Sequence, residues 1–166
     1  MRQGLAALAL LAGACARHEP DAAREPGPTF DPIMFFTGVS HGDASLKQIF
    51  KAERSMSVKS VGALGRDGTL TLTQRILVAG DKPRIRRWVM RRASGGTYAG
   101  RLTDAVGPVD TRAIGRAIRI RYRMKGGLDV EQWLVALPGG RVLDNRLTVS
   151  KWGIEVASVH ERIAKG

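Results

Sequence analysis

The sequence predicts an all-β protein whose antiparallel strands follow one another as a meander and close, or nearly close, into a barrel. Two observations carry this prediction. Apolar and polar residues alternate along most of the chain after residue 31, and glycine-rich segments separate the alternating runs at short intervals. A period of two is typical of strands with one buried face, and closure removes the edges that a long meander would otherwise expose. We count about nine or ten strands between Phe36 and Ile163, and expect a barrel of about eight to ten.

The clearest strand covers residues 118–125, where every second residue is apolar and the residues between them are cations. No amphipathic helix produces this alternation. Two further strands are predicted over residues 69–78 and 142–151, and a last one over residues 156–163 in preference to a short helix. On this last strand we expect Trp152, Ile154, Val156 and Ser158 to share one face. Residues 43–50 have weak helical spacing, and no long amphipathic helix is expected.

The segment Lys125-Gly126-Gly127 predicts the register of one hairpin. A loop of odd length pairs Arg123 with Asp129, Arg121 with Glu131, and Tyr122 with Val130. An even loop would instead place both carboxylates on the apolar face beside Tyr122, at a cost of roughly several kcal/mol. Because a slip of one residue inverts every side chain, we expect the odd register.

Length and composition bound the class of protein. The chain has 166 residues, with 27 Lys and Arg against 15 Asp and Glu, and a formal net charge of +12. Apolar residues make up 43% and charged residues 25%, which excludes a disordered or fibrous protein. The length fits one domain. The single cysteine excludes an intrachain disulfide framework and a cysteine-rich zinc site.

Residues 1–14 are predicted to be a secretory signal peptide. Arg2 is the only basic residue there, and residues 5–14 carry no charge. As a helix this apolar run would span roughly 15 Å, half of a hydrocarbon core of about 30 Å, so it is too short for an ordinary membrane span.

Small residues lead directly into Cys15, an arrangement that resembles the lipobox of bacterial lipoproteins, with Ala12 where leucine is usual. The resemblance implies that Cys15 is lipidated and becomes the N-terminus of a membrane-anchored protein. A plain signal peptide cut after Ala14, or a buried apolar cysteine, is the alternative. Ala16, where some bacteria use aspartate for inner-membrane retention, favours the outer membrane by resemblance to those sorting rules.

The domain organisation follows from this start. Residues 15–29 are predicted to be the lipidated cysteine and a disordered tether, and residues 30–166 the barrel domain. The tether is rich in proline, glycine and charge, so little of it can be buried. An ordinary frayed terminus would have the same composition.

Catalytic and metal-binding patterns are weak in this chain. Residues 38–42 fit the Gly-x-Ser-x-Gly pattern of hydrolases, but that motif needs a strand, a turn and a helix in a parallel sheet, which the sequence does not predict. His18, His41 and His160 are scattered without metal-ligand spacing. We therefore expect no enzyme, no metal site and no cofactor.

The basic excess is the remaining signal. The cationic face of the strand at residues 118–125 consists of Arg119, Arg121, Arg123 and Lys125, and it suggests an anionic partner. An export signal and an aromatic content of only 5% argue against nucleic acid. For an envelope protein the available anion is a lipid head group. Solvated arginines that only keep the barrel soluble are the alternative.

Several motifs resemble those of the family known as domain of unknown function 3833, a group of small bacterial lipoproteins. They are the segment 31–38 with Gly42, Trp88, residues 98–100, Asp104, Gly107, residues 121–124, Trp133, residues 145–146 and residues 150–153. The family tends to have aspartate and phenylalanine where this chain has Gln132 and Trp152. The resemblance covers nearly the whole chain after the tether. It implies a lipocalin-like (calycin-like) barrel and an envelope lipoprotein, and it implies no reaction.

Our functional hypothesis is a lipid-anchored protein on the periplasmic side of the bacterial envelope, with the outer membrane favoured. It would bind an apolar or acyl-chain ligand in the barrel, or an anionic membrane surface. The candidate ligand-binding residues are Trp88, Tyr122, Met124, Trp133 and Asn145. Asn145 is polar on an apolar face, so it needs a partner in the backbone or a ligand. The alternatives are a barrel filled by its own side chains and an assembly lipoprotein that binds another envelope protein.

Overall fold

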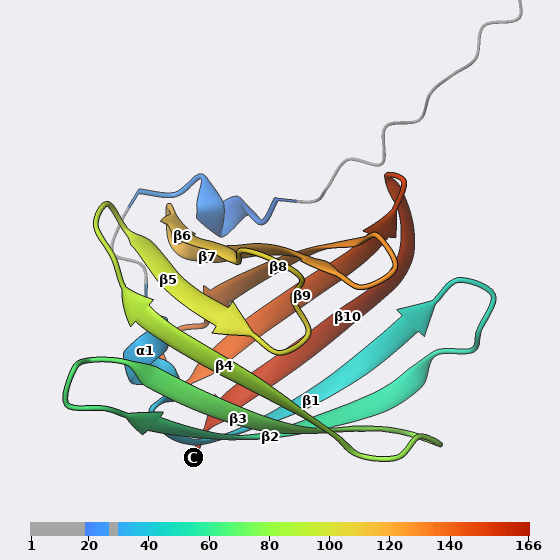
Figure 1. The fold of residues 1–166 in the computed structure, drawn as a ribbon, viewed down its shortest axis with the longest axis horizontal. Helices are drawn as coiled ribbons and strands as arrows, with labels where there is room; N and C mark the ends of the chain where they lie inside the picture. Colours follow the sequence, from blue (N-terminus) through green and yellow to red (C-terminus); the bar gives the residue numbers. More distant parts are fainter. Residues whose placement is uncertain (1–18, 27–29) are drawn as a thin grey trace, which may run out of the picture.

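A computed structural model describes residues 19–26 and 30–166, and shows ten antiparallel strands closed into a barrel (Figure 1). The strands are β1 (Gly38–Gln48), β2 (Arg54–Leu64), β3 (Leu70–Val78), β4 (Arg84–Arg92), β5 (Thr97–Leu102), β6 (Asp110–Ile114), β7 (Ala117–Met124), β8 (Leu128–Ala136), β9 (Val142–Lys151) and β10 (Ile154–Lys165). Each strand pairs with the next, and β1 pairs with β10. The predicted all-β meander and its closure are confirmed.

The β7–β8 hairpin has the register predicted from its glycines. Arg123 pairs with Asp129, and Tyr122 pairs with Val130. Gly126 and Gly127 both have positive φ, at 80° and 72°, a conformation that glycine adopts without steric cost. The inward side chains of β7 are therefore those of the apolar series that contains Tyr122.

One expectation for local structure is wrong, and one ambiguous segment is a strand. The segment with weak helical spacing forms no helix: as far as Gln48 it belongs to β1, because it pairs on both sides, with β2 and β10. The face predicted for the last strand holds only to residue 155. A β-bulge between Glu155 and Ala157 shifts the register, so Ser158 faces outward and Glu161 faces the interior.

Helix α1 (Pro32–Phe36) closes one end of the barrel (Figure 1). Asp31 caps it, since the Ile33 amide donates to Asp31 Oδ1 at 3.0 Å. Ile33 and Phe36 are buried in the main core, against apolar side chains of β3, β4 and β7 to β10. The turns that follow β1, β3, β5, β7 and β9 lie at the opposite end of the barrel, which we call the open end. None of the helices among residues 19–26 and 30–166 is long and apolar enough to cross a membrane.

The tether prediction is wrong for part of its length. Residues 21–23 form a short 3-10 helix, η1 (Asp21–Ala23), which lies against the outside of β7. Ala23 is buried, and the Arg116 amide donates to Ala22 O at 2.8 Å. An ion pair of 2.6 Å joins Arg116 and Glu25. Cys15 and the predicted signal peptide lie outside the described residues.

We predict that Gly62→Ala destabilises the protein by about 1–3 kcal/mol, because the plug formed by α1 leaves no space there. A Cβ atom on Gly62 would lie 1.8 Å from the Phe36 carbonyl oxygen. Urea unfolding monitored by circular dichroism measures the free energy of unfolding. Ala63→Ser, at the exposed neighbouring position, is the control and should change it by less than about 0.5 kcal/mol. Equal stabilities for the two variants would contradict the packing of α1 on β2.

Candidate functional site: a cup at the open end of the barrel

Polar side chains cross the barrel interior in a band that we call the polar belt. Its members are Ser40, Ser60, Gln74, Arg86, Gln132, Asn145 and Glu161. The register places them side by side, because Ser60 pairs with Gln74 and Gln74 pairs with Arg86. On the other wall Asn145 pairs with Glu161. The belt separates the apolar core above α1 from the open end.

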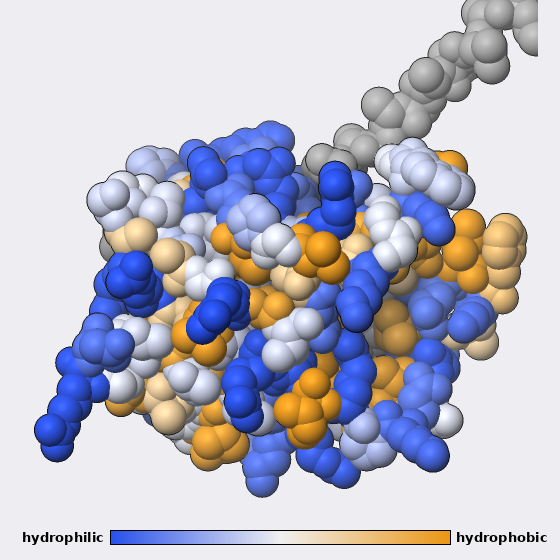
Figure 2. Space-filling view, viewed as in Figure 1, coloured by the Kyte–Doolittle hydropathy of each residue, from blue (hydrophilic) through white to orange (hydrophobic). Residues whose placement is uncertain are grey.

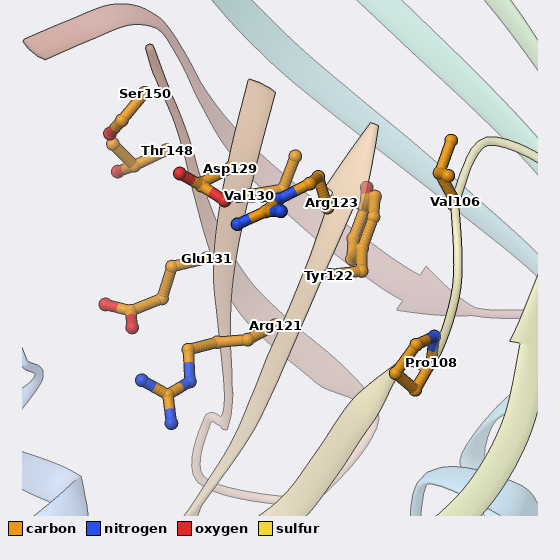
Figure 3. A pocket seen from close by; sticks show the side chains of 10 residues that line it. All are labelled: Val106, Pro108, Arg121, Tyr122, Arg123, Asp129, Val130, Glu131, Thr148 and Ser150. Atoms are coloured by element: carbon orange, nitrogen blue, oxygen red, sulfur yellow. Dashed lines mark hydrogen bonds and ion pairs between the residues drawn. The ribbon is translucent and has the colours of Figure 1, made fainter. Parts of the chain in front are cut away.

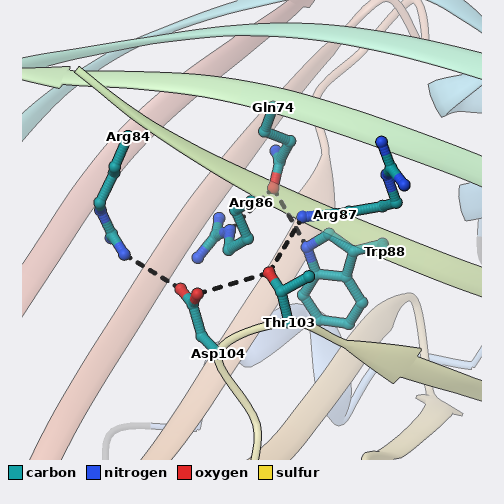
Figure 4. Close-up of polar contacts among 7 residues, drawn as sticks. All are labelled: Gln74, Arg84, Arg86, Arg87, Trp88, Thr103 and Asp104. Atoms are coloured by element: carbon teal, nitrogen blue, oxygen red, sulfur yellow. Dashed lines mark hydrogen bonds and ion pairs between the residues drawn. The ribbon is translucent and has the colours of Figure 1, made fainter.

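Gln74 is the centre of one half of the belt (Figure 4). Its Oε1 accepts hydrogen bonds from Arg86 Nε at 2.9 Å and from Trp88 Nε1 at 3.1 Å, and its Nε2 donates to Ser60 Oγ at 3.2 Å. The amide therefore satisfies a buried indole N–H and orients the Arg86 guanidinium. Arg86 still has donors on its terminal nitrogens that it can direct into the barrel.

Asn145 is the centre of the other half. Its Nδ2 donates to Glu161 Oε2 at 2.7 Å, and its Oδ1 accepts from Gln132 Nε2 at 2.9 Å. The partner predicted for Asn145 was the backbone or a ligand, and the structure supplies two side chains instead. Ser40 Oγ and Gln132 Oε1 are buried and have no hydrogen-bond partner among the described residues.

Glu161 is the carboxyl group of the belt and is only 5% exposed. Burial raises its pKa, while the hydrogen bond from Asn145 and the positive charge of Arg86 oppose that rise. No cation of the described chain lies within ion-pairing distance of it. The side chain fits because residue 42 is glycine: a Cβ atom there would lie 1.8 Å from Glu161 Oε1.

Beyond the belt, toward the open end, lies a cavity of about 130 Å³ that we call the cup. Its walls are apolar side chains from six strands: Leu46, Met56, Ile76, Val78, Met124, Leu147, Val149 and Val159. Its floor includes Arg86, Asn145 and Glu161 from the belt, and Tyr122. At the rim Arg84 forms an ion pair of 3.0 Å with Asp104 (Figure 4).

On the α1 side of the belt the barrel is filled by its own side chains. The remaining space is about 30 Å³, enough for about one water molecule. Trp88 packs edge to face on Tyr122, with ring centroids 6.2 Å apart. The barrel interior is therefore filled by side chains at the α1 end and hollow at the open end.

The structure brings together three of the five predicted ligand-binding residues. Tyr122, Met124 and Asn145 line the cup. Trp88 lies just below it, in the filled half. The prediction that Trp133 binds a ligand in the barrel is wrong. Its side chain lies on the outside of β8, in a small cluster with Ala23 and Ala117, and η1 covers it there.

The predicted anionic-surface residues Arg119, Arg121 and Arg123 lie on the outside of β7, and Lys125 follows in the turn after it. Of the four, Arg121 and Arg123 line a shallow groove of about 490 Å³ (Figure 3). Carboxylates neutralise much of this stripe. Asp110 lies 3.6 Å from Arg121 and 3.9 Å from Arg119, and Asp129 lies 3.2 Å from Arg123. Arg119 also lies over the Trp133 ring, 5.8 Å from its centroid. Lys125 forms no ion pair with any described residue.

Sequence reasoning missed Arg86 and Glu161, the two charged groups on the floor of the cup. For Arg86 the signal was present, because period two places it on the face of Trp88. Glu161 shares a face with Val159 and Ile163, but the bulge before them broke the pattern. Both residues were missed also because charged side chains are normally expected to face solvent.

The Gly-x-Ser-x-Gly segment lies on β1 and does not form a catalytic turn. Ser40 faces the barrel interior and His41 faces outward, as neighbouring residues of an ordinary strand do. Within residues 19–26 and 30–166 no group of three or more His, Cys, Asp or Glu side chains is arranged to hold a metal ion.

We predict that Glu161→Gln raises stability at neutral pH and not in acid. The unfolded carboxyl titrates near 4.5, and burial raises the folded pKa above that value. As pH rises through this window the unfolded state loses its proton first, so the wild type loses stability that the variant keeps. Urea unfolding at about pH 4 and about pH 8 should give equal values in acid and a more stable variant at the higher pH. Glu155→Gln, exposed on the same strand, is the control; a constant difference at both pH values would contradict the assignment.

Comparison with known proteins supports the fold and names the family. The S-type phycobiliprotein lyase CPES from Guillardia theta has a TM-score of 0.64 at 5% identity, over 81% of this chain and 90% of the lyase. A protein of unknown function from the DUF3598 family of Nostoc punctiforme has a TM-score of 0.61 at 12% identity, over 84% of this chain and 51% of that one. These likenesses show a lipocalin-like fold.

No curated protein matches the chain in sequence. A family model, described as protein of unknown function (DUF3833), matches residues 9–165. The predicted family resemblance is thereby confirmed, and the chain belongs to the DUF3833 family.

Proposed function

We propose that this protein is an envelope lipoprotein that binds an acyl chain, or a similarly apolar ligand with one polar end, in the cup. The observation that carries the proposal is an apolar wall above a floor that holds Arg86 and Glu161. A barrel that needed only a core would be filled at both ends, as it is beside α1. An assembly lipoprotein that acts only through its outer surface would not need such a cavity, so the cup favours ligand binding over that alternative.

The floor suits an oxygen-bearing ligand end. The Arg86 guanidinium is held through Nε by Gln74 and also lies beside the Tyr122 hydroxyl. Its remaining terminal N–H groups can donate to a carboxylate or ester oxygen. Glu161, when protonated, donates one hydrogen bond as well. The cup volume of about 130 Å³ is small, so the rest of the ligand would extend through the mouth.

The location proposed for this binding is the periplasmic side of the envelope, with the outer membrane favoured. Lipidation of Cys15 supplies the anchor, and the nearby acyl chains supply the ligand class. The proposal includes no enzymatic step, no metal or cofactor, and no nucleic-acid partner.

We predict that native protein extracted from bacterial membranes carries an acyl-bearing molecule, identified by organic extraction and mass spectrometry. Arg86→Gln should weaken binding of a fluorescent fatty acid about 10- to 100-fold, since a charge-assisted hydrogen bond contributes about 1.5–3 kcal/mol. Arg87→Gln is the matched control, because that exposed side chain points away from the cup (Figure 4). No co-purified material, together with equal affinities for the two variants, would overturn the proposal.

We predict that Cys15→Ser moves the protein from the membrane fraction to the soluble periplasmic fraction, because a serine cannot carry the thioether-linked anchor. Fractionation of cells followed by immunoblotting measures the shift, and a mass increase of the wild-type N-terminal peptide reports the acylation. A variant that remains in the membrane pellet after a high-salt wash would contradict anchoring through this residue.

A further inference from the structure

Two hairpin tips at the open end of the barrel expose large apolar side chains. Phe50 is 98% exposed in the β1–β2 hairpin and Trp152 is 87% exposed in the β9–β10 hairpin, with Ile49 and Ile154 exposed beside them. The tips are neighbours, since the Ile49 amide donates to Val156 O at 3.0 Å. Figure 2 shows apolar surface at the edge of the molecule where Figure 1 places the β1–β2 hairpin.

The backbone holds these aromatic residues in an unfavourable conformation. Phe50 (φ 60°) and Trp152 (φ 52°) are the non-glycine residues of positive φ in the described chain. Trp152 and Gly153 are the central pair of a two-residue hairpin in which both φ angles are positive, where asparagine-glycine is preferred. Neither packing nor turn geometry accounts for an aromatic side chain at these tips, because both rings lie in solvent.

Unpaired lysines surround the same end of the barrel. They lie in or beside four hairpin turns: Lys51, Lys82, Lys125 and Lys151. None forms an ion pair with a described residue, whereas Glu53 and Asp81 nearby are paired with Lys47 and Arg54. The Lys151 ammonium lies 4.8 Å from the centroid of the Trp152 ring. Lysines around exposed aromatic and aliphatic tips match the chemistry of an anionic lipid surface.

We propose that the open end docks on an anionic bilayer, with Phe50 and Trp152 inserted at the lipid interface and the four lysines on head groups. The walls of the cup run directly into these hairpins, since Leu46 and Val149 precede the two tips in the chain. Docking would therefore place the mouth of the cup against the membrane. The role of this orientation in ligand binding rests on the proposed function, whereas the docking surface does not depend on it.

The stripe on β7 is the competing membrane surface. Its arginines are paired with Asp110 and Asp129. The groove beside it exposes Val106 but, among the described residues, no aromatic side chain comparable with Phe50 and Trp152. Lys125, at the end of the stripe, belongs to the lysine group of the open end as well. The two surfaces make different predictions for the same vesicle experiment.

The test uses the chain from residue 15 with Cys15→Ser, which keeps every described residue and removes the anchor. Sedimentation with phosphatidylcholine vesicles, with and without phosphatidylglycerol, measures partitioning. We expect binding to the anionic vesicles and a loss of about tenfold or more in Phe50→Asn/Trp152→Asn. Asparagine favours positive φ, so the melting temperature of this variant should hold or rise while its binding falls. Each lysine changed to glutamine should reduce binding about fivefold.

Met34→Ser is the apolar control at the closed end and Lys59→Gln is the charge control, since both residues are exposed away from the mouth. Trp152 also reports insertion directly, because Trp88 and Trp133 are buried. Its emission should shift to shorter wavelength on vesicles, and Trp152→Phe should lose the shift but keep binding. Unchanged binding of the asparagine variant, or loss of binding only in Arg121→Gln/Arg123→Gln, would overturn the proposal. Because no ligand or anchor is present, failure here leaves the ligand and lipidation tests unaffected.

Discussion

Pairing of β1 with β10 is the constraint on which the rest of this structure depends. It removes both sheet edges and encloses one face of every strand, so each inward polar group must find its partner inside the barrel. Gln74 and Asn145 supply most of those partners on opposite walls, and each links side chains from neighbouring strands. Ser40 Oγ and Gln132 Oε1 have no partner among the described residues. The polar belt is thus a consequence of closure as much as of composition.

Closure also makes the two ends of the barrel different. A meander of ten strands directs alternate turns to opposite ends, and the chain enters and leaves at the same end. Helix α1 lies at that end and its phenylalanines fill the interior. At the other end no helix or strand of the described residues covers the opening, so the apolar walls above the belt remain accessible as the cup. Ligand binding and membrane docking are both proposed for this second end for that reason.

The positive charge of the molecule is only partly paired with carboxylates. Some strand arginines lie beside carboxylates, as around Asp110, where a planar guanidinium pairs well with a carboxylate. Others, such as Arg87 and Arg101, form no ion pair with a described residue. The lysines in the turns of the open end also form none, so unpaired positive charge includes the end that carries Phe50 and Trp152.

Much of the fold could be predicted because alternation of side chains is a local property. It predicted the all-β meander, the register at Gly126 and Gly127, and the inward face of β7, which carries Tyr122 and Met124 into the cup. Glycine turns of short length leave few ways to pair consecutive strands, so the topology followed as well.

The remaining features needed the tertiary structure, because local alternation does not say which face is covered or by what. Trp133 is buried on the outside only because η1 lies over it, and α1, at five residues, is too short to show a period. The bulge after Glu155 adds one residue to β10 and so turns Glu161 inward. Arg86 and Glu161 come from distant segments of the chain and line the same cavity only because the barrel closes. The chemistry of the cup was therefore decided by the tertiary structure.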